Sequence, residues 1–287
     1  MIVTRFAPSP TGFLHLGHAF AAFSAYQQAL ASGGRFLLRI EDIDLTRCRP
    51  QFERAIREDL QWLGLAWEEP VRRQSEHFAD YAAALAKLDA AELVYPCFCT
   101  RKEIAAEIAR AGIAPSAAES ADEGAIYPGT CRAMSPAARE RRVADGEAYA
   151  LRLDVAKALA SVGVLAFKES GCGPHGETGM QTARPELSGD IVLARKELPT
   201  SYHLAVVVDD ALQGVSLVTR GNDLFPATHI QRLLQALLGF PAPDYAHHRL
   251  VLDAKGRKFS KRDRAVTLAS LREKGETPES LRAMLGM

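Results

Sequence analysis

The stretch that decides the fold is Thr4-Arg5-Phe6-Ala7-Pro8-Ser9-Pro10-Thr11-Gly12, followed by His15-Leu16-Gly17-His18. Residues 4–7 have the length and apolar content of a short buried strand. The turn residues from Pro8 to Gly12 prevent a helix from starting early. Residues 19–30 are mostly apolar and helix-favouring, and Ser32-Gly33-Gly34 ends them. The sequence therefore predicts a strand, a turn and a helix in close succession.

The segments that follow continue this alternation. Residues 35–40 predict a second strand, and residues 53–63 predict an amphipathic helix whose apolar face begins at Phe52. Strand, helix and strand in this order favour an α/β fold with a doubly wound parallel sheet. Further along, the apolar runs 190–193 and 204–208 are typical of buried parallel strands. Residues 228–238 and 278–284 predict helices.

The composition changes after Tyr95-Pro96, where Ala-rich helical pieces, clustered cysteines and a Gly-rich run at 171–176 interrupt the sheet pattern. We interpret this stretch as an insertion into the α/β domain. The predicted division is residues 1–95 for the first half of that domain, 96–184 for the insertion, 185–246 for the second half, and 247–287 for a C-terminal segment.

Composition limits the functional classes. Lys+Arg and Asp+Glu both number 35, so net charge argues neither for nor against a nucleic-acid partner. From His247 onward ten basic residues face five acidic ones, which predicts either a phosphate-binding region or a solvated surface. The N-terminus lacks the pattern of a signal peptide and no apolar stretch has the length of a membrane span, so we expect a cytoplasmic protein. Five cysteines in such a chain argue against a disulfide framework.

Two short motifs point to chemistry on ATP at its α-phosphate. His15 and His18 are spaced i, i+3 on one helical turn, so both can reach one phosphoryl group, and Gly17 would let a nucleotide approach the backbone closely. Lys258-Phe259-Ser260-Lys261-Arg262 has closely spaced cations that suit a clamp on a triphosphate. Either motif alone is also compatible with unrelated surface residues. A pantothenate-synthetase-like nucleotidyltransferase shares the first motif but not the blocks at 39–42 and 220–223.

The two motifs together resemble a class I aminoacyl-tRNA synthetase, and five blocks in order resemble the glutamyl/glutaminyl-tRNA synthetase family. These blocks are residues 5–18, Leu37-Leu38-Arg39-Ile40-Glu41-Asp42-Ile43-Asp44, Tyr202-His203-Leu204 with Val207-Val208-Asp209-Asp210, Val218-Thr219-Arg220-Gly221-Asn222-Asp223-Leu224, and the lysine motif. The resemblance implies a Rossmann-type catalytic domain, an enzyme of the ligase class, and the substrates ATP and glutamate with Mg²⁺ to offset charge.

The resemblance also implies roles for individual residues. Arg5 and Arg220 would bind the carboxylates of glutamate, Glu41 its ammonium group, and Tyr202 would donate or accept a hydrogen bond. For Arg5 and Glu41 a structural ion pair is the alternative. The full glutamate-binding set is Arg5, Phe6, Ala7, Pro8, Ser9, Glu41, Tyr202 and Arg220. The ATP-binding set is Pro8, His15, Gly17, His18, Lys258, Ser260 and Lys261, of which His15, His18, Lys258 and Lys261 are the catalytic candidates.

The insertion of this family can carry zinc, which gives the clustered cysteines a role. Cys97, Cys99 and Cys131 would supply thiolates, and Tyr127 would supply a phenolate as fourth ligand of a tetrahedral structural site. His175 or Cys172 are the alternatives for the fourth position.

The short tail decides the expected acceptor. Only 25 residues follow Arg262, too few for an anticodon-binding domain of about 100 residues. This layout resembles the glutamyl-queuosine tRNA(Asp) synthetases, which activate glutamate without tRNA and attach it to the queuosine base in the anticodon loop of tRNA(Asp). Members of that group can lose the second histidine, whereas this chain keeps His18. The alternatives are a shortened glutamyl-tRNA synthetase that charges the 3′ end of tRNA(Glu), and a non-catalytic tRNA-binding paralogue. We expect a monomer.

Overall fold

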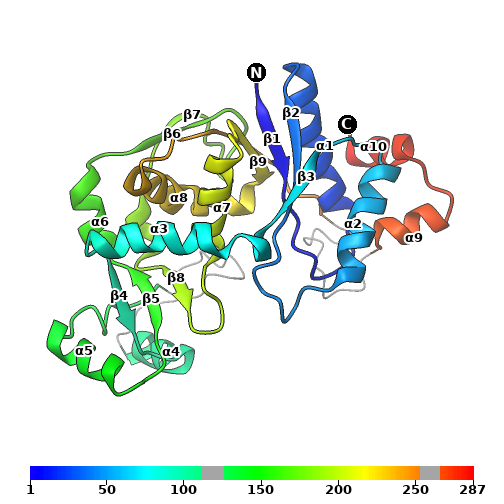
Figure 1. Cartoon of the computed structure of the whole chain (residues 1–287). Helices are drawn as coiled ribbons and strands as arrows, with labels where there is room; N and C mark the ends of the chain where they lie inside the picture. Colours follow the sequence, from blue (N-terminus) through cyan, green and yellow to red (C-terminus); the bar gives the residue numbers. More distant parts are fainter. Residues whose placement is uncertain (111–125, 253–265) are drawn as a thin grey trace.

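The fold starts from a parallel three-stranded sheet in the order β1-β2-β3, with β1 (Val3–Phe6), β2 (Arg35–Ile40) and β3 (Glu68–Arg73). Helices α1 (Leu16–Ala31) and α2 (Pro50–Trp62) connect these strands. The computed structural model describes residues 1–110, 126–252 and 266–287. Figure 1 shows this sheet and its helices on one side of the molecule. The predicted first two strands and two helices are therefore confirmed to within a few residues.

A second sheet continues the first. Its order is β7-β6-β10-β9, in which β6, β10 and β9 run parallel and β7 is antiparallel to β6. The bounds are β6 (Ala166–Glu169), β7 (Gly179–Thr182), β9 (Leu217–Gly221) and β10 (Asp244–His248). The two sheets meet where the Ser216 N–H donates to the Val3 carbonyl at 3.0 Å. This arrangement is the predicted doubly wound α/β fold.

Helix α1 packs directly on the junction of the two sheets. Its buried face consists largely of small residues, among them Ala19, Ala22 and Ala25, which let the helix axis approach the strands. The Thr4 hydroxyl donates to the Ala25 carbonyl at 2.8 Å and fixes the helix over β1. The start of α1 is thereby held at the carboxyl end of β1.

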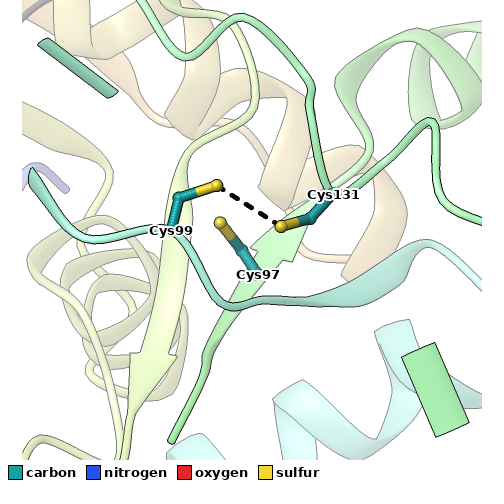
Figure 2. Close-up of side chains that lie close together, drawn as sticks. All are labelled: Cys97, Cys99 and Cys131. Carbon is teal, nitrogen blue, oxygen red and sulfur yellow. Dashed lines mark hydrogen bonds between the residues drawn. The ribbon is translucent and has the colours of Figure 1, made fainter. Parts of the chain in front are cut away.

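A small antiparallel sheet forms a separate layer below the parallel strands in Figure 1. It has the order β4-β5-β8, with β4 (Val94–Cys97), β5 (Ala150–Leu153) and β8 (Val192–Arg195). Figure 2 shows the cysteine side chains that gather beside it. The run 190–193 was predicted to be a buried parallel strand, and that prediction is wrong, because β8 pairs antiparallel with β5. The predicted division of the chain at residue 184 stays a prediction.

The run 204–208 was also predicted to be a strand, and it lies instead in helix α7 (Tyr202–Leu212). Every residue from His203 to Asp210 is buried, so the helix shows no alternation of apolar and polar residues from which its period could be read. The signal that was available is Ser201, whose side chain accepts a hydrogen bond from the Leu204 N–H and caps the helix.

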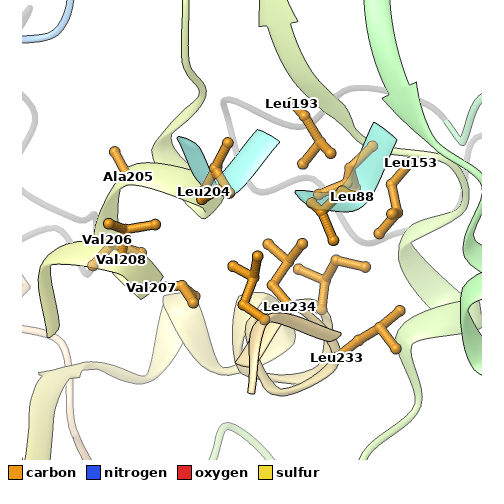
Figure 3. Packing of buried hydrophobic residues seen from close by; sticks show 14 of the residues in the cluster. Leu88, Leu153, Leu193, Leu204, Ala205, Val206, Val207, Val208, Leu233 and Leu234 are labelled. Carbon is orange, nitrogen blue, oxygen red and sulfur yellow. The ribbon is translucent and has the colours of Figure 1, made fainter. Parts of the chain in front are cut away.

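Two large apolar clusters and a small one around Tyr95 and Phe98 stabilise the part of the chain that the structure describes. The largest one joins α3 (Phe78–Ala90), α7 and α8 (Phe225–Leu238) to the small sheet through Leu153 and Leu193. Figure 3 shows these side chains together with Leu204, Leu233 and Leu234. The remaining helices are α4 (Arg101–Arg110), α5 (Pro136–Ala144), α6 (Val155–Val162), α9 (Leu268–Glu273) and α10 (Pro278–Leu285).

The second cluster attaches the C-terminal helices α9 and α10 to α1 and α2.

Among the helices in the three described ranges, none combines the length and the apolar character that a membrane span requires.

Asp59 of α2 is a buried carboxylate in the interface between α2 and α9. Its side chain is fully buried, and within the described residues neither carboxylate oxygen accepts a hydrogen bond. Arg272 of α9 lies 3.6 Å from Oδ1. Burial raises the pKa of Asp59 to about 6 from 3.8, although Arg272 acts in the opposite direction. The carboxylate is therefore most compatible with the fold when it is protonated.

We predict that Asp59→Asn flattens the pH dependence of stability. Because the pKa is raised in the folded state, the stabilisation is complete below pH 3.8 and is lost as the pH rises through about 6. Wild type should lose about 3 kcal/mol relative to the variant across that window. Urea unfolding at pH 4, 5, 6 and 7 measures the difference. Glu140→Gln, at an exposed position of α5, is the control, and parallel curves for wild type and Asp59→Asn would contradict the prediction.

Candidate active site

His15 and His18 organise the start of α1. The Gly17 N–H donates to Nδ1 of His15 at 3.1 Å, and the His15 N–H donates to Nδ1 of His18 at 3.2 Å. Their ring centroids are 3.8 Å apart. Because both Nδ1 atoms accept hydrogen bonds, each neutral ring carries its proton on Nε2. The prediction that the two rings lie together on one turn is confirmed.

Gly17 favours this arrangement. A Cβ atom at this position would lie 3.1 Å from Cε1 of the His15 ring. Glycine leaves room for the His15 ring over the first turn of α1. The sequence alone did not show this reason for glycine. Whether a nucleotide also approaches the backbone here stays a prediction.

The C-terminal segment returns to the same point. Thr267 forms an isolated antiparallel bridge with His15, and the Leu268 N–H donates to the Leu14 carbonyl at 2.9 Å. The predicted ATP-binding residues Lys258, Ser260 and Lys261 lie outside the described residues. The chain that carries them is thus anchored beside His15 at its later end.

The residues after β1 and β2 lie at one edge of the sheet. The Glu41 N–H donates to the Pro8 carbonyl at 3.1 Å, which brings the segment Ala7–Ser9 next to the end of β2. Phe6 is buried as the last residue of β1. The carboxyl edge of parallel strands is where α/β folds bind ligands, so these predicted residues have the expected location.

Arg5 is paired inside the protein. Its Nε and Nη2 donate to the two carboxylate oxygens of Asp210 at 3.0 and 3.2 Å, and its Nη1 donates to the Thr219 carbonyl. Arg39 donates to the same Asp210 at 2.8 Å. Although burial opposes it, these two arginines hold the pKa of Asp210 below its usual value. The structure therefore gives Arg5 an ion-pair partner, and its contact with a ligand stays a prediction.

Glu41 has a different electrostatic environment. Its Oε1 lies 3.3 Å from Nη2 of Arg39. Burial raises the pKa of Glu41, and the attraction of Arg39 and Arg5 does not fully offset this effect. An additional cation beside this carboxylate would lower its pKa and stabilise its charged form. Glu41 is thus suited to bind an ammonium group.

Arg220 is a buried cation with neutral partners. Its guanidinium donates to Tyr202 Oη at 3.4 Å, to Gln231 Oε1 at 2.8 Å and to Thr228 Oγ1 at 2.6 Å. Arg220 is only 6% exposed, and no carboxylate of the described chain forms an ion pair with it. Because an uncompensated buried charge is costly, this geometry favours an anionic ligand. The predicted pair Arg220 and Tyr202 is brought together.

Three acidic residues around these arginines were not predicted as part of the site. Asp209 accepts hydrogen bonds from Arg72 at 2.7 Å and from Tyr81 at 3.0 Å, and Asp210 binds Arg5. Glu169 contacts His247 behind Arg220. Two adjacent carboxylates after the apolar run 204–208 were the available signal, since such residues are rarely buried without cationic partners.

The three thiols of the small layer lie together. Sulfur atoms of Cys97, Cys99 and Cys131 are all within 4.8 Å of one another, and those of Cys99 and Cys131 are 3.4 Å apart. Figure 2 shows the three side chains pointing toward one another. Tyr127 Oη lies 3.5 Å from Sγ of Cys99. Thiolates around a tetrahedral zinc with Zn–S bonds of about 2.3 Å would be roughly 3.8 Å apart. The predicted set of three thiols and a phenol therefore fits a zinc ion.

The alternatives for the fourth ligand do not fit. The Cys172 N–H donates to the His247 carbonyl at 3.0 Å, which places it against β10, and His175 follows in the same turn. Neither belongs to the group of potential ligands around Cys97. Among the predicted candidates, Tyr127 is the fourth donor that the fold places beside the thiols.

The sequence matches the family "tRNA synthetases class I (E and Q), catalytic domain" over residues 1–287. A protein of Rhodobacter capsulatus named glutamyl-Q tRNA(Asp) synthetase is 47% identical, with 100% of both chains covered. A glutamate–tRNA ligase of Aquifex aeolicus is 38% identical over 98% of this chain and 55% of its own length.

The fold is similar to that of solved ligases. A glutamate tRNA ligase of Elizabethkingia meningosepticum in complex with its amino acid superposes with a TM-score of 0.78 and 27% identity. All of this chain is covered, and it spans 60% of that ligase.

We predict one zinc ion per chain, held by Cys97, Cys99, Cys131 and Tyr127. Cys131→Ser should abolish bound zinc and lower the melting temperature, because the metal links the end of β4 to the 127–131 turn. Metal analysis of purified protein, with and without chelator, measures this. Cys172→Ser is the matched control and should keep full occupancy. Equal zinc content in the two variants would contradict the assignment.

Proposed function

Since this chain belongs to the family of class I tRNA synthetases for glutamate and glutamine, which are ligases, we propose that it activates glutamate with ATP in the absence of tRNA. We propose further that it transfers the activated glutamate to the queuosine base in the anticodon loop of tRNA(Asp). The observation that carries the proposal is the 47% identity to the Rhodobacter glutamyl-Q tRNA(Asp) synthetase over the whole of both chains. The geometry of the site supports each chemical step separately.

Glutamate binding is supported by the charges at the sheet edge. The guanidinium of Arg220 offers a cation without an internal carboxylate partner among the described residues, and Tyr202 Oη lies 3.4 Å from it. Glu41 offers the opposite charge for the ammonium group. A site that offers both a cation and a carboxylate is complementary to an amino acid with an extra acidic group. The remaining proposed contacts are Arg5, Phe6, Ala7, Pro8 and Ser9.

The first reaction joins glutamate to AMP. An α-carboxylate oxygen attacks the α-phosphorus of ATP, the bond to the β-phosphate oxygen breaks, and pyrophosphate leaves. His15 and His18 donate from Nε2 to phosphoryl oxygens whose negative charge increases in the transition state. Lys258 and Lys261, both outside the described residues, would bind the departing phosphates. Mg²⁺, when bound with ATP, offsets phosphate charge.

The second reaction transfers the glutamyl group to RNA. A hydroxyl of the queuosine cyclopentenediol attacks the adenylate carbonyl and releases AMP. Two exposed cations at the small antiparallel sheet, Arg101 and Arg195, support an RNA partner. Burial lowers the pKa of Arg195, and Arg101 lies close enough for its charge to lower that pKa further. Like charges gathered in this way favour phosphate binding. The Cys97–Cys131 zinc site would stabilise this layer.

Two assays test the proposal. Glutamate should support exchange of labelled pyrophosphate into ATP in the absence of tRNA. Labelled glutamate should then enter queuosine-containing tRNA(Asp) but not the same tRNA without queuosine. The similarity to the Aquifex glutamate–tRNA ligase makes charging of tRNA(Glu) the competing function. Exchange that requires tRNA, with label in tRNA(Glu), would establish that alternative, and no exchange under either condition would reject both enzymes.

We predict that Arg220→Gln raises the KM for glutamate at least about 30-fold in pyrophosphate exchange. The variant removes the cation while it keeps a side chain that can hydrogen-bond. The KM for ATP should change little, because ATP contacts the start of α1. Arg35→Gln, which breaks an exposed ion pair with Glu68, is the control. A similar KM for glutamate in the two variants would exclude Arg220 from the substrate site.

A further inference from the structure

Glu169, the last residue of β6, is a fully buried carboxylate behind the proposed substrate site. Its Oε1 accepts from the backbone N–H groups of Gly171 at 2.8 Å and His247 at 2.9 Å. Its Oε2 lies 2.5 Å from Nδ1 of His247. Burial alone would raise its pKa, but the hydrogen bonds from His247 and Gly171 outweigh this effect and lower the pKa of Glu169. The carboxylate is therefore ionised and acts only as an acceptor.

Gly171 makes this position possible. A Cβ atom on Gly171 would lie 2.2 Å from the His247 carbonyl oxygen and 2.7 Å from its nitrogen. Because these are backbone atoms, no side-chain movement could relieve the overlap. The close approach of residues 170–172 to β10 is thus built into the fold, and it fixes the Glu169 carboxylate against the His247 ring.

The hydrogen bonds assign the tautomer of His247. Nδ1 donates to the ionised Glu169, so the neutral ring leaves Nε2 as an acceptor. Nε2 accepts from Nε of Arg220 at 3.1 Å. Burial lowers the pKa of His247, and Arg220 acts in the same direction, although Glu169 opposes both. The His247 ring therefore remains neutral. It is held by the buried Glu169 carboxylate at Nδ1 and in turn holds the Arg220 guanidinium at Nε2.

This arrangement distinguishes Arg220 from Arg5. Asp210 binds Arg5 directly through two oxygens. Arg220 instead contacts the His247 ring, and the Glu169 carboxylate lies on the other side of that ring. A carboxylate bound directly to Arg220 would compensate its positive charge and weaken its attraction for a substrate carboxylate. The His247 ring accepts from Nε, and the acceptors of Nη1 and Nη2 on Tyr202, Gln231 and Thr228 are neutral as well, so the charge of the guanidinium stays uncompensated at close range.

We propose that Glu169 and His247 are positioning residues that orient Arg220 toward the carboxylate of bound glutamate. The proposal rests on the function proposed above and assigns residues to it that do not themselves contact the substrate. In this scheme Glu169 sets the His247 tautomer, and the tautomer determines whether Arg220 has an acceptor at Nε.

Glu169→Gln tests the tautomer directly. The amide oxygen of the substituted side chain can still accept from the two backbone N–H groups, so its NH₂ group would face Nδ1 of His247. That ring nitrogen would become the acceptor, and Nε2 would then carry the proton and oppose the N–H of Arg220. We expect the KM for glutamate in pyrophosphate exchange to rise roughly 10- to 100-fold, with kcat and the KM for ATP changed less than about twofold.

A second pair of variants separates the two ring nitrogens. His247→Gln places an amide near the position of Nε2 and keeps an acceptor for Arg220, whereas His247→Asn mimics only the Nδ1 side. We expect the KM for glutamate to rise more in His247→Asn than in His247→Gln. Asp244→Asn, which breaks the exposed pair with Lys168 on the same two strands, is the control and should match wild type. Thermal unfolding of all variants monitors folding.

The outcomes are distinct. An unchanged KM for glutamate in folded Glu169→Gln, with an active wild type, would overturn the positioning role and leave the proposed function intact. Equal effects of His247→Gln and His247→Asn, or a parallel loss of kcat, ATP affinity and thermal stability, would reduce the pair to a structural contact. Absence of glutamate-dependent exchange in the wild type would instead reject the proposed function, and with it the substrate that this proposal assigns.

Discussion

The carboxylate pair at Asp209 and Asp210 is the interaction on which the rest of the structure depends. Helix α7 directs these two side chains toward the strands of the first sheet. Asp210 binds Arg5 from β1 and Arg39 from β2, and Asp209 binds Arg72 from β3. Buried charges are costly when they are unpaired, so any shift in the register of these strands would expose an uncompensated cation or anion. The cluster therefore ties the second half of the domain to a single arrangement of the first.

This constraint explains why the ligand-binding edge is well defined. Arg39 is completely buried and binds Glu41 as well as Asp210, so the end of β2 has little freedom. The Glu41 N–H in turn holds the Pro8 carbonyl. On the other side of the junction, β9 presents Arg220 in register with His247 of β10. Helix α1 packs on β1 and β9, the two strands that carry Arg5 and Arg220.

The sequence was informative where a signal is local. β2 and the helices α2, α8 and α10 follow from periodicity, turn residues and caps. The pair Cys97 and Cys99 follows from close spacing in the chain, whereas Cys131 and Tyr127 were added through the family resemblance. Helix α7 was missed because all its residues from 203 to 210 are buried, which removes the contrast that reveals a helical period and leaves the cap residue Ser201 as the available signal. β8 was placed in the wrong sheet, since a four-residue apolar run does not specify its partner. Pairing partners depend on tertiary contacts between segments that lie far apart in the chain.

The same limit applies to the two arginines of the site. Arg5 and Arg220 look equivalent in their motifs, and both are buried at strand positions that flank the junction. Their difference lies in partners contributed by other elements: Asp210 of α7 for Arg5, and His247 of β10 for Arg220. Direct ion pairing gives Arg5 a structural contribution that does not depend on ligand. Because the partners of Arg220 are neutral, its positive charge is not compensated by the protein, and an anionic substrate would compensate it. Residue type thus identifies both arginines as candidates for binding, and the partners supplied by other elements show that, of the two, Arg220 is the one whose charge no carboxylate of the described residues compensates.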